Sequence, residues 1–126
     1  MSSLDVVSRF EKVYIGDSLI ERIELNLVTA VCRVFLSEAS LLREVTDIFN
    51  PAQRFEPACL RLEGVRSITC AEGEFYLNNT VVDFDASAVD DTQVRFKLEM
   101  TGGRENETFM RSLMFIARDF ALGAAE

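Results

Sequence analysis

Six acidic side chains between residues 72 and 91 are the groups in this sequence with the clearest capacity for chemistry. Paired carboxylates perform general acid–base catalysis when an apolar pocket holds one of them protonated. They bind calcium when they follow the spacing of a ligand loop, and on an exposed face they attract a basic partner. The six residues are Glu72, Glu74, Asp83, Asp85, Asp90 and Asp91.

The spacing of residues 83–94 does not match that of a calcium-binding loop. Asp83, Asp85 and Ser87 fit the first three ligand positions of an EF-hand loop. Ala88 stands where the turn glycine belongs, and Val94 stands where the bidentate Glu belongs. We therefore expect a solvated strand face followed by an acidic loop, and no metal site.

Catalysis is disfavoured because the chain contains no histidine. This absence removes the usual general base, the base of nucleophile pairs and the commonest metal ligand. Cys32, Cys59 and Cys70 lie in apolar, strand-like contexts without a neighbouring base, so we expect buried, inert thiols. Cys59 and Cys70 are too far apart for a disulfide if one straight strand joins them. We predict a non-enzyme without catalytic, cofactor-binding or metal-binding residues.

Composition narrows the possible partners. The chain has 21 acidic and 13 basic residues, a net charge of −8 and 48% hydrophobic residues. Nucleic acids and anionic membranes require clustered basic residues, so both are disfavoured as partners. A basic protein partner suits the charge. Because no signal peptide or long apolar run is present, we predict one cytoplasmic domain over residues 1–126. Lys12 and Lys97 are the only lysines among the basic residues, a bias typical of GC-rich bacteria.

The first half of the chain changes from helical to strand periodicity. A serine at position 2 or 3 caps a predicted helix over residues 3–12, although residues 10–15 alternatively form a strand. Residues 19–38 alternate with the two-residue period of a β-hairpin. Residues 39–57 lose this alternation, and we expect an irregular excursion or a short helical turn there.

The second half is dominated by alternating segments. We predict a strand over residues 59–69 with a bulge or a twist at Gly64, then a strand over residues 80–86. A C-terminal hairpin covers residues 93–121. In its second strand, residues 108–121, apolar residues occupy both alternating faces, which indicates a central strand covered on both faces. The predicted fold is α+β and β-rich, a mostly antiparallel twisted sheet or partial barrel of about six strands with an N-terminal helix.

Several short motifs resemble a family of small, uncharacterised, β-rich bacterial domains. The motifs are Tyr14-Ile15-Gly16-Asp17-Ser18-Leu19-Ile20, Ile23-Glu24-Leu25-Asn26, Leu77-Asn78-Asn79 and Val82-Asp83-Phe84. Some families of this kind are toxin-neutralising immunity proteins. The resemblance implies a protein-binding role and carries over no catalytic or cofactor residues.

The leading functional hypothesis is therefore a non-enzymatic protein-binding module, immunity-like, that uses an acidic face. The six acidic residues named above are its predicted contacts. The alternative is a small-ligand carrier or minor enzyme with an apolar pocket inside the sheet. A third interpretation is a homo-oligomer that associates through residues 108–121, if that strand is left uncovered.

Overall fold

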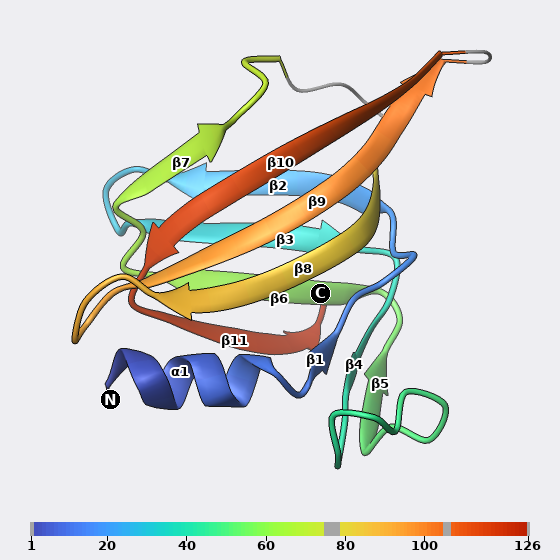
Figure 1. The fold of residues 1–126 in the computed structure, drawn as a ribbon, viewed down its shortest axis with the longest axis vertical. Helices are drawn as coiled ribbons and strands as arrows, with labels where there is room; N and C mark the ends of the chain where they lie inside the picture. Colours follow the sequence, from blue (N-terminus) through green and yellow to red (C-terminus); the bar gives the residue numbers. More distant parts are fainter. Residues whose placement is uncertain (1, 75–78, 105–106, 126) are drawn as a thin grey trace.

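The computed structural model describes residues 2–74, 79–104 and 107–125, and this part of the chain forms one helix and eleven strands in three antiparallel sheets (Figure 1). The prediction of a β-rich fold with an N-terminal helix is confirmed, but that of about six strands in one sheet is wrong. Three additional strands are too short for an alternation to reveal them. They form the smallest sheet, in the order β1 (Val13–Tyr14), β4 (Ala39–Leu41) and β5 (Gln53–Phe55).

Helix α1 spans Ser3–Phe10, two residues shorter than predicted. The Ser2 side chain caps it by accepting a hydrogen bond from the backbone amide of Asp5 at 3.3 Å. Val6 and Phe10, four residues apart on one helical face, are fully buried. The alternative strand at residues 10–15 is reduced to β1. Within the described residues, no helix is long and apolar enough to cross a membrane.

One four-stranded sheet confirms the predicted hairpin at residues 19–38. Strands β2 (Ile20–Asn26) and β3 (Val31–Leu36) pair antiparallel. The Asn26 side chain stabilises their turn by accepting hydrogen bonds from the backbone amides of Val28 and Thr29, each at 3.0 Å. Every second residue of β3 is buried, including Cys32. The sheet order is β11 (Asp119–Ala124), β6 (Ala58–Glu63), β3 (Val31–Leu36) and β2 (Ile20–Asn26).

The second four-stranded sheet contains the predicted C-terminal hairpin. Strand β10 (Glu107–Ala117) lies between β7 (Ser67–Cys70) and β9 (Val94–Arg104), so its predicted central position is confirmed. However, the prediction that both of its faces are covered is wrong, since Met110 on the outer face is 51% exposed. The hairpin also ends earlier than predicted, because residues 119–121 belong to β11 in the other sheet. The order is β7 (Ser67–Cys70), β10 (Glu107–Ala117), β9 (Val94–Arg104) and β8 (Thr80–Ala88).

The single strand predicted over residues 59–69 is in fact β6 and β7, which belong to different sheets. The chain crosses between the sheets at Gly64, whose φ of +64° is a conformation that residues with a Cβ rarely adopt. The amide of Val65 then donates to the Ala30 carbonyl at 2.8 Å, and that of Arg66 donates to the Ile116 carbonyl at 2.7 Å. The alternation of residues 59–69 continues across Gly64 although the strands that pair with this segment change there, so the sequence pattern did not predict the change of sheet.

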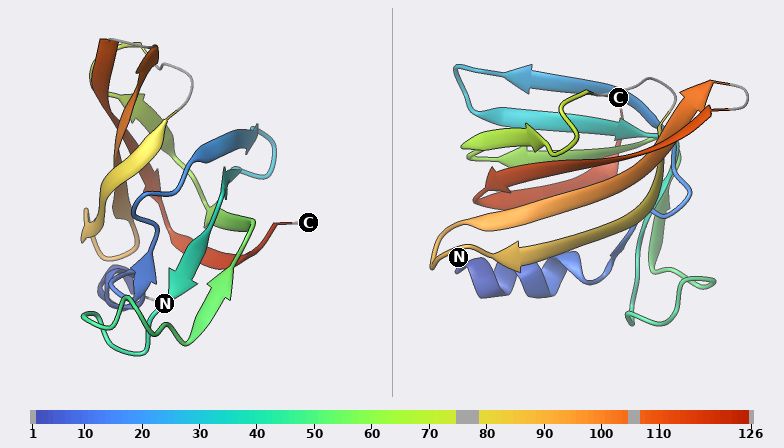
Figure 2. Two further views of the ribbon diagram at one scale, coloured as in Figure 1. Left: turned by 90° about the vertical axis from the view of Figure 1, so that its right-hand side faces the viewer. Right: turned by 45° about the horizontal axis from the view of Figure 1, so that its top comes forward.

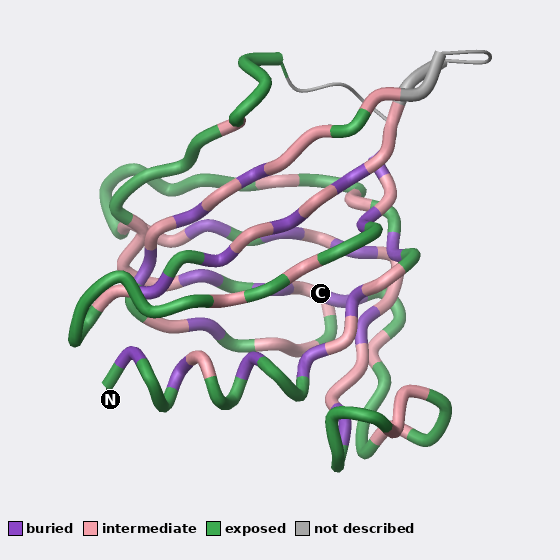
Figure 3. Tube along the Cα trace, viewed as in Figure 1, coloured by how far each residue is buried: buried purple, intermediate pink, exposed green. Residues whose placement is uncertain are grey.

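The hydrophobic core lies between the two larger sheets, and α1 closes one side of it (Figure 2). The Phe10 ring packs edge-on against Phe120, Phe96 and Phe84, at centroid distances of 5.1, 5.2 and 6.4 Å. Buried residues alternate along the strands (Figure 3), so each sheet has one face in the core and one face outside. The largest fully buried side chains include Phe96, Phe115, Leu36, Leu60 and Leu62.

Residues 39–57 form β4, β5 and the loop that connects them, without the helical turn that the sequence suggested. The Leu42 amide donates to the Lys12 carbonyl at 2.8 Å, and the Ala52 amide donates to the Leu41 carbonyl at 2.8 Å. These bonds tie the loop ends to β1 and β4. Non-local hydrogen bonds therefore override the weak helical propensity of this segment.

Candidate functional site

Three carboxylates lie at one level across the sheet β7-β10-β9-β8, and two of them, Asp83 and Glu99, are on its outer face. Strand pairing places Asp83 opposite Glu99, and Glu99 opposite Ser112. The backbone amide of Ser112 donates to Glu72 Oε1 at 2.7 Å, which brings Glu72 to the same level from beyond the end of β7. These three residues and Asp85, two positions after Asp83 on the same face of β8, are called the acidic patch below.

Lys97 is the cation within the patch. It lies opposite Asp85 on the neighbouring strand, and its Nζ atom is 2.9 Å from Glu99 Oε1. The hydrogen bond and charge of Glu99, followed by the charges of Asp85 and Asp83, raise the pKa of Lys97. The ammonium is therefore held in its charged form, and the carboxylates around it still outnumber it.

The facing pair of Asp83 and Glu99 opposes the stability of the sheet. Like charges directly opposite each other on neighbouring strands are destabilising. Lys97 forms its ion pair with Glu99 and lies opposite Asp85, and the charge of Asp83 contributes least of the three to the raised pKa of Lys97, so the repulsion at Asp83 is only partly offset. A cation supplied from outside would lower the electrostatic energy of this face.

A shallow depression of about 500 Å³ crosses the same face beside the patch. Met114 and Ile116 give it an apolar floor, while Asp85, Lys97 and Arg95 give it charged walls. Such an apolar floor with a polar rim resembles the anatomy of a protein-binding surface more than that of an enclosed catalytic pocket. Its lining is completed by Thr69 and Ser87.

Asp90 and Asp91, two of the predicted contacts, lie outside the patch in the β8–β9 turn. The Asp90 carboxylate accepts hydrogen bonds from the backbone amides of Thr92 and Gln93, each at 2.9 Å. These hydrogen bonds, that from Thr92 first, lower the pKa of Asp90. The Asp91 carbonyl accepts a hydrogen bond from the backbone amide of Ser3 at 3.0 Å. These bonds shape the turn and attach it to the start of α1.

Glu74 also lies outside the patch, and Glu99 was missing from the predicted set. The exposed Glu74 uses its backbone carbonyl to accept hydrogen bonds from Arg111 Nε at 2.8 Å and from Cys70 Sγ at 3.3 Å. The strict alternation of residues 93–100 marks Glu99 as an outward residue. Its position opposite Asp83 depends on the register of β8 against β9, which the alternation does not contain.

No cluster of three His, Cys, Asp or Glu side chains suited to a metal ion occurs among the described residues. The carboxylates of the acidic patch lie in a row across the sheet, and Lys97 already occupies the space beside Glu99 and Asp85. The arrangement therefore suits a cationic side chain better than a coordinated metal.

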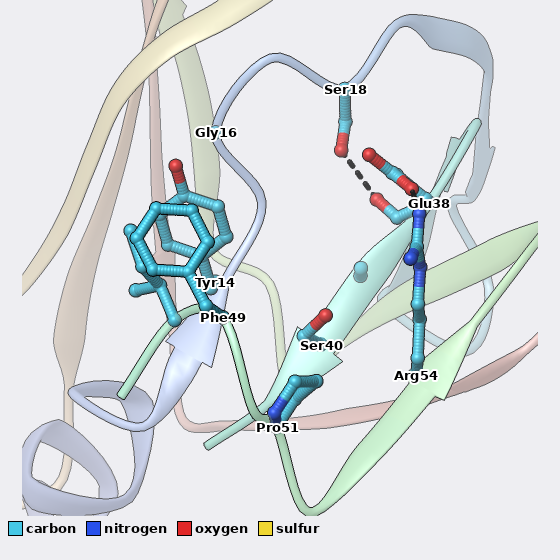
Figure 4. Close-up of a pocket in the computed structure, with 10 residues that line it drawn as sticks. Tyr14, Gly16, Ser18, Glu38, Ser40, Phe49, Pro51 and Arg54 are labelled. Atoms are coloured by element: carbon cyan, nitrogen blue, oxygen red, sulfur yellow. Dashed lines mark hydrogen bonds and ion pairs between the residues drawn. The ribbon is translucent and has the colours of Figure 1, made fainter. Parts of the chain in front are cut away.

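A second hollow of about 220 Å³ lies against the small sheet β1-β4-β5 (Figure 4). Arg54 forms an ion pair with Glu38, and Ser18 donates a hydrogen bond to the Glu38 carbonyl. Tyr14 and Phe49 form its aromatic side (Figure 4). This hollow lies outside the main core, whereas the apolar pocket of the alternative hypothesis was expected inside the sheet. The polar groups of Arg54, Glu38 and Ser18 already bond one another.

The three cysteines are free thiols in different surroundings. Cys32 is buried, and its pKa is raised to about 11 by that burial and, to a smaller extent, by nearby Cys59. Burial also raises the pKa of Cys59. The prediction of buried thiols is correct for Cys32 but wrong for Cys59 and Cys70, which are half-buried. Cys59 and Cys70 also lie on different sheets, so no straight strand separates them.

The burial of Cys32 predicts a pH-dependent loss of stability. The unfolded thiol ionises near 9.0 and the folded thiol near 11, so the unfolding free energy should fall as the pH rises through this window. Comparison of wild type with Cys32→Ala by urea denaturation at several pH values isolates this contribution.

In the native protein at pH 8, Ellman's reagent should modify Cys59 and Cys70 before Cys32, because Cys32 is buried. Equal rates at all three thiols would contradict the prediction.

Comparison with known proteins identifies no relative of this chain. No protein-family model matches the chain, and searches of curated proteins and of solved structures find no match. The resemblance to immunity-like bacterial domains therefore stays a prediction.

Proposed function

We propose that this protein is a non-enzymatic protein-binding module whose acidic patch docks a basic segment of a partner protein, in the manner of an immunity protein and a basic toxin. The observation that carries the proposal is the facing pair of Asp83 and Glu99 on an exposed sheet face. A lysine or arginine of the partner stabilises this pair when it binds.

The depression beside the patch supports the same function. Met114 and Ile116 are half-buried, so an apolar side chain of the partner can cover them. The net charge of −8 accelerates the encounter with a basic protein at low salt. Charge thus steers association, and the apolar floor adds contact area.

The hollow at β1-β4-β5 gives weaker support to the alternative of a small-ligand carrier. A ligand site usually presents polar groups that converge on an occupant. Here Arg54 and Glu38 bond each other, and Ser18 bonds the Glu38 carbonyl. A polar ligand would have to replace these bonds before it gained any of its own.

The double variant Asp83→Lys/Asp85→Lys tests the proposal. We expect its affinity for a lysine- and arginine-rich peptide, measured by titration calorimetry in 50 mM salt, to be at least about tenfold lower, which is about 1.4 kcal/mol. Both positions are exposed, so circular dichroism should show an unchanged fold.

The matched control is Glu11→Lys/Glu44→Lys, which changes the net charge equally at exposed sites outside the patch. It should lower the affinity less than about twofold, because diffuse attraction is screened by salt. An equal loss in both variants would show that net charge alone governs binding, and would overturn the patch as a site. The immunity-like part of the proposal further predicts a toxin gene beside the gene for this protein.

A further inference from the structure

Strand β2 is an edge strand of the sheet β11-β6-β3-β2. It pairs with β3 on one side; on its other side the first residue, Ile20, donates to the Asn79 carbonyl at 2.9 Å, and no strand of the described residues pairs with the rest of that side. Figure 2 shows it at the outer margin of the molecule. An edge strand presents a row of backbone amides and carbonyls that can pair with another chain.

Features that usually protect an edge are sparse along the second half of β2. A bulge lies near its start, between Ile20 and Arg22, but the pairing with β3 is regular from there to Asn26. Leu25 faces the core side and is still 44% exposed. In the turn that follows, Leu27 is 84% exposed and Val28 is 95% exposed. This apolar surface beside an open edge favours a partner strand.

The opposite edge of the same sheet, strand β11, is covered by helix α1. Strand β11 faces α1, where Arg9 donates to the Phe120 carbonyl at 2.9 Å and forms an ion pair with Asp119 at 2.9 Å. The helix therefore takes the place that another strand would need. Within the described part of the chain, β2 is the edge of this sheet that has no such cover.

The charges of β2 select one pairing register with a second copy. An antiparallel pair related by a two-fold axis keeps equivalent faces on the same side. Centring it on Arg22 places two arginines opposite each other, and centring it on Glu24 places two glutamates opposite each other. Centring it on Ile23 places Arg22 of each copy opposite Glu24 of the other, which gives two complementary pairs.

We propose that two copies of this chain associate through β2 in the register centred on Ile23, joining two four-stranded sheets into one continuous sheet. Within one copy, Arg22 Nε is 3.5 Å from Glu24 Oε2 and the guanidinium lies 4.0 Å from the centroid of the Phe35 ring. The stacking holds Arg22 on the outer face. An exposed ion pair of this kind is weak, so exchanging it for a pair between copies costs little.

Charge exchange at the two positions tests the proposal by sedimentation equilibrium. We expect wild type to dimerise and the single variants R22E and E24R each to weaken the dimer at least about tenfold, because each places like charges opposite each other. An equimolar mixture of R22E and E24R should dimerise again, since the mixed pair restores both complementary contacts. The double variant R22E/E24R should also dimerise.

Arg61→Glu is the control, because it reverses a charge on the same outer face in β6, which has strands on both sides. It should leave the dimer intact, as should the Asp83→Lys/Asp85→Lys variant of the acidic patch. A monomeric wild type at about 0.5 mM would overturn the proposal. So would a mixture of R22E and E24R that stays as weakly associated as either variant alone.

Discussion

Replacement of Phe10 by alanine should lower the unfolding free energy by about 3–5 kcal/mol, the largest loss we expect from a single truncation. The Phe10 side chain is 2% exposed and packs against Phe96 and Phe120 at centroid distances of 5.2 and 5.1 Å. Its removal leaves a cavity at the place where α1 closes the core. Because the rings come from three elements, the loss should affect the attachment of the helix to both sheets.

Urea denaturation followed by circular dichroism measures this loss. Leu4→Ala is the control on the same helix, since Leu4 is 71% exposed and should change the unfolding free energy by less than about 0.5 kcal/mol. If Phe10→Ala unfolds the protein entirely, Phe10→Leu should retain the fold with a smaller loss. Equal effects at positions 4 and 10 would mean that the helix packs through another face.

Leu62→Ala should lower the unfolding free energy by about 2–5 kcal/mol. Leu62 has an exposed fraction of 0% and lies in β6 between two paired strands, opposite Cys32 on β3 and Phe120 on β11. Its side chain faces the core. A cavity in this position is enclosed by strands on both sides, so relaxation around it is limited.

Arg61→Ala is the matched control, because adjacent residues of a strand point to opposite faces. Arg61 is exposed and forms an exposed ion pair with Glu63 at 3.3 Å, so its truncation should cost less than about 1 kcal/mol. A larger loss at Arg61 than at Leu62 would contradict the assignment of the inner and outer faces of this sheet.

Local periodicity predicted much of the strand content. The alternation of residues 19–38 predicted β2 and β3, and that of residues 93–121 predicted β9 and β10. The serine cap and the three-residue spacing of Leu4, Val7 and Phe10 are equally local, so the helix was also predicted. The buried face was predicted only in part, because the structure buries Phe10 with Val6 and leaves Leu4 71% exposed. Strands of two or three residues such as β1, β4 and β5 were missed because they contain less than two periods of the pattern.

The acidic patch was predicted only in part. Asp83 and Asp85 were recognised as outward residues from their alternation with Val82 and Phe84, and both are exposed. Phe84 is half-buried as expected, but Val82 is 45% exposed because the pairing of β8 with β9 is irregular between Val81 and Asp83. Their association with Glu99 and Glu72 depends on the pairing of β8 with β9 and on the bond from Ser112 to Glu72. Asp90 resembled a binding residue in the sequence, but its carboxylate is bonded to the amides of its own turn.

The sequence by itself determined most of the segments that extend, because a two-residue alternation depends on neighbours within a few positions. Its composition determined the net negative charge. Only the tertiary structure decided that residues 58–63 and 67–70 enter different sheets, that Glu99 faces Asp83 and that β2 is left as an edge. Strand order and register are set by hydrogen bonds and core packing between residues far apart in the chain. A two-residue alternation is compatible with many such pairings, and the packing of the two sheets against α1 selects one.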